Sequence, residues 1–271
     1  MMAELVSIKD YYNKLVQVQT SIMIVEALDA ELHHHMNNTA AVFEGAMRVY
    51  GIQDKERGDA FKKVWREVAE ELTIMSNDLM QDVRTDANDL AVENTHLEDL
   101  VAHPEQMTPK NFMLLAAFND RLRSVDEKLR EIRIDSEIRL LRSSGLVGGD
   151  FSLEEQSEAF KAHYTKLTQV QMSGKVARAF EKEIEKRFGA TGESARIMKP
   201  VSEGVLNLNV TSTRLLDLVT HSGMLTDETF IRLSALNDTL NTANENFRKL
   251  QARLEISRMK QKGVVPAGFT I

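Results

Sequence analysis

The sequence predicts an all-α protein made of two tandem three-helix bundle repeats with long, coiled-coil-like helices. Three observations indicate this fold class: long stretches without proline, apolar residues at helical spacing, and a sequence that repeats itself in order. The 271 residues include four prolines and no cysteine. The lack of cysteine excludes disulfides, thiolate metal sites and cysteine nucleophiles.

Three pairs of similar segments carry the internal repeat. In chain order they are 11–19 with 163–171, 96–122 with 214–240, and 142–152 with 260–270. The first pair agrees at six of nine positions with an offset of 152, and the second at twelve of 27 positions with an offset of 118. We therefore interpret residues 1–152 as repeat 1, with a helical insertion of about 34 residues, and residues 153–271 as repeat 2 with a C-terminal tail.

The first helix of repeat 1 is expected to begin at a capping box formed by Ser7 and Asp10. We expect it to run to about His35, because the polar residues 37–39 (NNT) follow. A short helical segment should then end at the natural cap Gly51.

From about residue 54 to residue 103 the pattern predicts one long helix with a coiled-coil-like apolar stripe and one stutter. Thr108 and Pro109 should begin the last helix of repeat 1, which runs to about Arg142. The helices of repeat 2 are expected to run from Ser152 to Phe188, from Pro200 to His221, and from Thr226 to Lys262.

Two pairs of repeated polar residues are candidate structural sites. Asn119 and Asn237 interrupt apolar stripes, so we interpret them as polar residues that fix helix register. His103 and His221 end their helices, where an imidazole can cap the last carbonyls. A binding role for the asparagines and a catalytic role for the histidines are the alternatives.

Two Glu-x-x-His pairs, Glu31/His34 and Glu93/His96, raise the alternative of a ferritin-like dinuclear metal protein. The missing glutamates would come from Glu44, Glu67, Glu70 and Glu71. Because the residues aligned with Glu93 and His96 are Thr211 and Arg214, the pattern is not repeated, and we expect no metal or other cofactor. The run 33–35 (HHH) could bind a metal adventitiously, although an exposed helix end explains it as well.

Residues 121–142 contain six arginines and one lysine against five acidic residues. This segment raises a third alternative, a nucleic-acid-binding accessory protein. The interspersed signs favour a salt-bridged helix face instead, so nucleic acid is an unlikely partner on this reading.

The charge differs between the repeats. Residues 1–152 carry a net charge of −10 and residues 153–271 a net charge of +3, so the two are complementary within one chain or between neighbouring chains. The tail 263–271 (GVVPAGFTI) resembles the joint 145–153 but precedes no helix. We therefore predict that Phe269, Thr270 and Ile271 of one subunit contact the region of Met1 in the next, in a head-to-tail oligomer. The alternative is a tail that folds back on its own subunit or is frayed.

We expect a non-enzymatic scaffold or interaction protein, with protein partners or self-association. No glycine-rich phosphate loop or convergent catalytic group is present in the sequence. There is no signal peptide and no apolar run near the length of a membrane span, so a cytoplasmic location is expected.

Overall fold

The computed structural model describes residues 5–49 and 55–271, and within them the predicted all-α class is confirmed, with no strand. The α-helices are α1 (Ile8–Val49), α2 (Lys55–Asp89), α3 (Leu97–Ala102), α4 (Pro109–Ser144), α5 (Glu158–Phe188), α6 (Gly192–Asn207), α7 (Leu215–Thr220) and α8 (Asp227–Gln261). Short 3₁₀ turns η1 (Val92–Asn94), η2 (Pro104–Gln106) and η3 (Ser222–Met224) flank α3 and α7.

Several predicted boundaries were wrong. In the second half, the helix expected from Pro200 to His221 is divided into α6, which begins at Gly192, and the separate α7, and the helix expected from Ser152 begins at Glu158. Helix α1 continues through residues 37–39 to Val49, because Asn and Thr lower helix propensity by less than about 1 kcal/mol each. The helix predicted to span residues 54–103 ends at Asp89. There Ala91 adopts a left-handed conformation with φ 49°, and the chain bends through η1 into α3.

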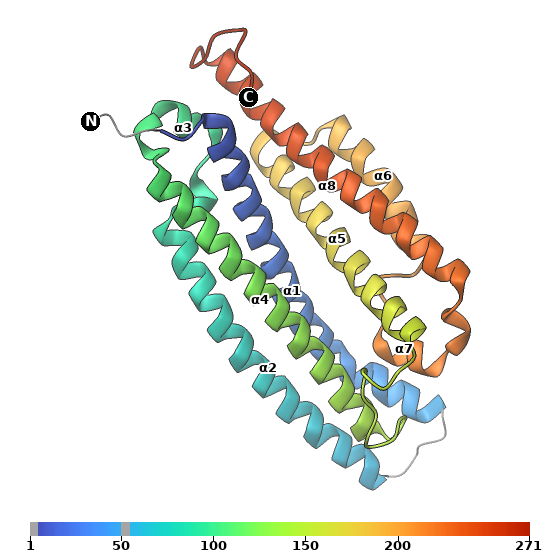
Figure 1. Cartoon of the computed structure of the whole chain (residues 1–271). Helices are drawn as coiled ribbons and strands as arrows, with labels where there is room; N and C mark the ends of the chain where they lie inside the picture. Colours follow the sequence, from blue (N-terminus) through green and yellow to red (C-terminus); the bar gives the residue numbers. More distant parts are fainter. Residues whose placement is uncertain (1–4, 50–54) are drawn as a thin grey trace.

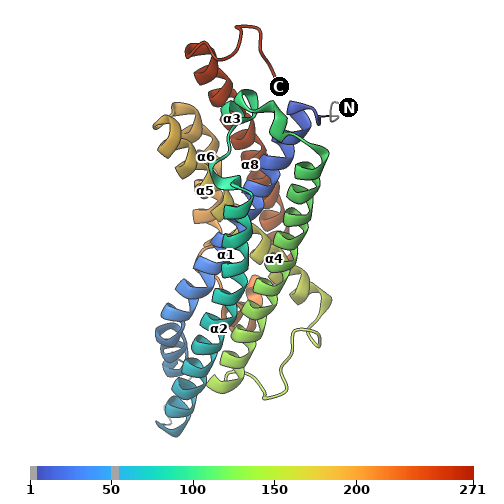
Figure 2. The ribbon, with the colours of Figure 1, turned by 90° about the vertical axis from the view of Figure 1, so that its left-hand side faces the viewer.

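The helices form one elongated bundle in which two groups of long helices lie side by side (Figure 1). Helix α1 packs against α2 and α4, and α5 packs against α6 and α8. The two groups meet where α1 packs against α5. Helix α3 lies beside α8 at one end of the bundle, and α7 lies beside α4 at the other (Figures 1 and 2).

We call residues 1–152 the first half and residues 153–271 the second half. Both halves have the same order of elements: a long helix, a second helix, a bend, a short helix and a second long helix. The first half is longer because both arms of its α1–α2 hairpin are extended. At the 118-residue offset, Ala91 and Asn209 have φ values of 49° and 52°, and Gly145 and Gly263 have φ values of 71° and 72°.

The buried apolar residues form one core that runs through both groups of helices. Its largest side chains are aromatic, and the rings of Phe180 and Phe247 stack at 6.2 Å with an angle of 9° between their planes. Burial of such side chains supplies most of the free energy that holds long amphipathic helices together. The polar residues described next lie within this apolar setting.

Candidate functional site

Two buried glutamates cap the short helices across the boundary between the halves. Glu255 on α8 accepts hydrogen bonds from the backbone N–H of Leu97, the first residue of α3, at 3.1 Å and from the Tyr12 hydroxyl at 3.2 Å. Glu137 on α4 accepts one from the backbone N–H of Leu215, the first residue of α7, at 3.1 Å. A carboxylate here satisfies a free backbone donor and the positive end of the helix dipole. Each half therefore caps the short helix of the other half.

The charges of both glutamates are matched by arginines. The guanidinium of Arg187 donates to Glu255 at 2.7 Å, and that of Arg133 donates to Glu137 at 3.0 Å. Burial, reinforced by the Glu255 carboxylate, raises the pKa of Tyr12, so its phenol remains a proton donor. Both carboxylates thus bond a helix N-terminus and an arginine.

Two glutamines, which the sequence analysis did not single out, hold the bends before α3 and α7. The amide of Gln19 donates to two carbonyl oxygens at 2.9 and 3.0 Å, and that of Gln171 donates to two at 2.7 and 2.8 Å. The acceptors are Val92 and Thr95 in the first half and Val210 and Thr213 in the second. The available signal was the repeated segment QVQ, which ends on these two glutamines.

The two predicted Glu-x-x-His pairs do not come together. Glu31, 6% exposed, forms ion pairs with Lys175 and Arg214 of the second half. Burial opposes the charged form, but these cations lower the pKa of Glu31 below its usual value. His34 and Glu93 are exposed on α1 and η1.

The other proposed ligands are also apart from any metal-like cluster. Glu67, Glu70 and Glu71 are exposed on α2, and Glu71 bonds Arg139 at 2.5 Å. The side chain of Glu44 and that of His35 lie outside the described residues. Among the residues that the structure describes, no three His, Asp or Glu side chains are grouped as metal ligands would be.

His96 precedes α3, and its backbone N–H donates to Asp99 at 2.7 Å. Its ring Nδ1 is buried without a hydrogen-bond partner in the described part of the chain. Burial, with the nearby Arg187 guanidinium, lowers the pKa of His96. The neutral imidazole is therefore the form that the fold favours.

The repeated asparagines have different surroundings. Asn119 is buried on α4 and accepts a hydrogen bond from the Ser21 hydroxyl at 2.9 Å. Asn237 is only half-buried on α8. His103 and His221 follow the last residues of α3 and α7, and their backbone N–H groups cap those helices.

The C-terminal tail is folded onto its own chain. Val265 is buried, and Phe269 and Ile271 are partly buried against the core, whereas Thr270 is exposed. Lys262, just before the tail, pairs with Glu98 of α3 at 2.7 Å. Met1 lies outside the described residues.

The arginines of residues 121–142 are mostly engaged within the protein. Arg130 pairs with Asp126, Arg133 with Glu137, and Arg121 and Arg139 with carboxylates of α2. Paired guanidinium groups of this kind leave few free cations for phosphates. This face is a set of salt bridges rather than a continuous basic track.

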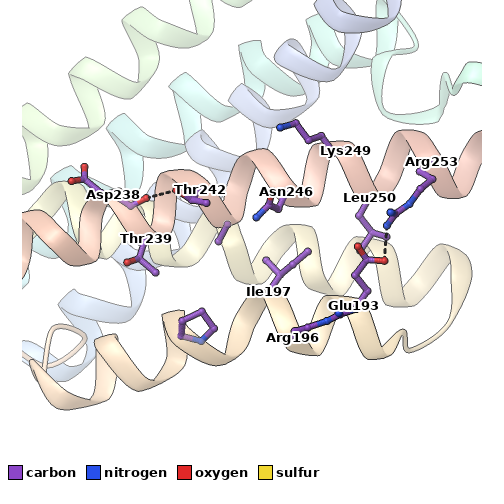
Figure 3. A pocket seen from close by; sticks show the side chains of 12 residues that line it. Glu193, Arg196, Ile197, Asp238, Thr239, Thr242, Asn246, Lys249, Leu250 and Arg253 are labelled. Atoms are coloured by element: carbon purple, nitrogen blue, oxygen red, sulfur yellow. Dashed lines mark hydrogen bonds and ion pairs between the residues drawn. The ribbon is translucent and has the colours of Figure 1, made fainter. Parts of the chain in front are cut away.

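An open groove of about 690 Å³ lies between α6 and α8 (Figure 3). Ile197 and Leu250 form part of its apolar lining, and Arg196, Lys249 and Arg253 stand around it. Glu193 bonds Arg253 at 2.5 Å across the groove (Figure 3), and Glu245 pairs with Lys249 at 2.6 Å. Arg196 forms no ion pair with any residue that the structure describes.

The first half carries the opposite charge at the positions that match these three cations. At the 118-residue offset, Asp78 corresponds to Arg196, Glu131 to Lys249 and Asp135 to Arg253. All six side chains are exposed. Beside Asp78 on α2 lie two exposed apolar residues, Ile74 at 62% and Met75 at 50% exposure. We call Asp78, Glu131, Asp135, Ile74 and Met75 the acidic face.

Among the described helices, none is both long and apolar enough to span a membrane. No family model matches this chain, and no curated protein or solved structure shows significant similarity to it.

Proposed function

We propose that the protein is a non-enzymatic structural subunit that binds other copies of itself, the acidic face of one copy contacting the α6–α8 groove of the next. The observation that carries this proposal is the charge reversal between matched exposed positions of the two halves. Complementary charges steer association and fix which surfaces pair. The charge reversal at these positions is part of the difference in net charge between residues 1–152 and 153–271.

The proposal includes a duplicated architecture. We infer that residues 1–152 and 153–271 are two copies of one three-helix unit, the first enlarged by about 34 residues in its α1–α2 hairpin. The matched left-handed residues, glutamine-held bends and crosswise glutamate caps support this reading. A duplicated unit presents two equivalent surfaces, so opposite charges on them allow one to bind the other.

Apolar contact would supply the affinity that surface charge alone does not. Exposed ion pairs contribute only about 0–1 kcal/mol each, whereas burying a large apolar side chain contributes about 1.5–3 kcal/mol. Ile74 and Met75 on the acidic face would meet the apolar lining of the groove, including Ile197 and Leu250. Arg196, which forms no ion pair with a described residue, would meet Asp78.

The position of the two surfaces determines the kind of assembly. Helices α2 and α6 lie on opposite edges of the bundle (Figure 1). A contact between different surfaces on opposite edges is heterologous, so it extends into a ring or a filament. The C-terminal tail is not required for this contact.

Sedimentation over a range of concentrations at low and high salt tests the proposal. The wild-type chain should form oligomers that dissociate at high salt. Asp78→Arg should weaken association by about tenfold, as expected for loss of about 1.4 kcal/mol at an interface. The double variant Asp78→Arg/Arg196→Asp should regain association, because it exchanges the charges.

Ile231→Lys is the matched control, because Ile231 is 65% exposed but lies outside both surfaces. It should associate as the wild type does. A wild-type chain that stays monomeric at millimolar concentration and low salt would refute the proposal. Deleting residues 263–271 distinguishes this contact from one made by the C-terminal tail. If the deletion abolishes oligomers and Asp78→Arg leaves association unchanged, the tail forms the contact instead.

A further inference from the structure

A second groove, of about 650 Å³, lies where the two halves meet, and α1, α4, α5 and α8 all contribute to it. We call it the junction groove. Helix α8 presents a polar stripe to it, formed by Asn237, Asn241, Asn244 and Arg248. These positions follow the i, i+4, i+7, i+11 pattern of one helix face. Its volume is in the range of small-molecule sites between helices of bundles.

The matching stripe of α4 is satisfied within the protein. There Asp126 and Arg130, four residues apart, form an ion pair in which the Arg130 Nε donates to both carboxylate oxygens, at 3.1 and 3.0 Å. At the 118-residue offset their counterparts on α8 are Asn244 and Arg248. An amide thus occupies the place of the carboxylate.

This exchange leaves two polar groups without partners in the described residues. The Oδ1 atom of Asn244 is buried and accepts no hydrogen bond. Arg248 forms no ion pair with a described residue; Glu245, whose charge acts on it, is bonded to Lys249 at 2.6 Å. Leaving a buried acceptor unsatisfied costs about 1–3 kcal/mol. The groove therefore has an unfilled acceptor beside an unpaired cation.

We propose that the junction groove binds a small carboxylic acid that also carries an N–H or O–H donor. The ligand carboxylate takes the place beside Arg248 that Asp126 holds beside Arg130, and its donor bonds the Oδ1 of Asn244. The amides of Asn237 and Asn241 lie farther along the same stripe and contact the rest of the molecule. This site is separate from the α6–α8 groove and does not depend on self-association.

The electrostatic setting agrees with an anionic ligand. Desolvation, opposed by Glu245, lowers the pKa of Arg248. A bound anion would therefore stabilise the charged form of its guanidinium. The Arg248 side chain remains exposed enough for a ligand to reach it. A guanidinium binds either a carboxylate or a phosphate through two parallel hydrogen bonds, so selection of the acid would depend on the asparagine amides.

Isothermal titration with N-acetyl-L-glutamate, which has both carboxylates and an amide N–H, tests the site. N-acetyl-L-glutamine amide serves as the uncharged probe and inorganic phosphate as the other anion. We expect saturable binding of the acid, at least tenfold tighter than either comparison compound. The same titration followed by NMR should shift the side-chain amide signals of the α8 asparagines.

Asn244→Asp is the decisive variant, because it recreates on α8 the ion pair of Asp126 and Arg130. It should weaken binding of the acid by at least tenfold while keeping or raising the melting temperature. Arg248→Gln should weaken binding to a similar degree, and Arg196→Gln in the α6–α8 groove should leave it unchanged.

Three results would overturn the proposal. They are no saturable binding of the acid, equal affinity for phosphate and the acid, or unchanged binding by Asn244→Asp. The melting temperature of Asn244→Asp shows that the variant is folded, so its binding result is interpretable either way.

Discussion

Replacing Glu255 by glutamine should be one of the most destabilising conservative changes in the chain. Glu255 is 5% exposed and accepts hydrogen bonds from Leu97, Tyr12, Arg187 and Gln251. A glutamine amide can still accept from two of these donors, but its NH₂ group would face the donors of Arg187 and Gln251. The Arg187 side chain, 14% exposed, would then be a nearly buried cation without a counter-ion.

Breaking a buried ion pair by removing one partner costs about 3–5 kcal/mol, so Glu255→Gln should lower the free energy of unfolding by about 3 kcal/mol. Urea denaturation followed by circular dichroism at 222 nm measures this, with the slope of the transition expected to stay constant. The matched control is Glu193→Gln, which removes the exposed ion pair with Arg253 and should cost about 0–1 kcal/mol. A loss below about 1 kcal/mol for Glu255→Gln would refute the reasoning.

Three further outcomes are expected. Phe247→Ala removes a fully buried ring that stacks on Phe180 and should cost about 3–5 kcal/mol in urea denaturation, with native-like helicity retained. Gln171→Leu leaves two bend carbonyls without their donor and should cost about 2–4 kcal/mol, read from the shift in the urea midpoint. Because the pKa of His96 is lowered in the folded chain, the unfolded chain binds more protons just below pH 6.5, so stability falls as the pH drops through that value. His96→Asn should flatten this part of the stability-against-pH curve, and an unchanged slope would contradict the assignment.

The helical class and the starts of α1, α2, α4 and α8 could be predicted because their signals are local. Capping residues such as Ser7, Thr108 and Thr226 act within one turn, and apolar spacing of three and four residues is visible in any window. The bend after Asp89 could not be predicted in this way. Ala91, which turns the chain there, is a strong helix former, and the bend is held by Gln19 from another helix.

The same distinction applies to the two proposed binding surfaces. The charge difference between the halves can be read from the sequence as net charge. The individual residues that carry it become informative only when the structure shows that Asp78 and Arg196 are exposed. Likewise, Asn244 and Arg248 look unremarkable on a helix rich in polar residues. Their significance comes from the missing partners in the junction groove, which depend on four helices at once.

The crosswise caps impose an order on how the chain can fold during synthesis. The carboxylate that caps α3 at Leu97 belongs to Glu255, 158 residues farther along the chain. During synthesis the first half leaves the ribosome before Glu255 has been added to the chain. Until then, α3 lacks the carboxylate that caps it. Helix α8 therefore completes the first half as well as the second, and a chain truncated before Glu255 would leave α3 without its capping carboxylate.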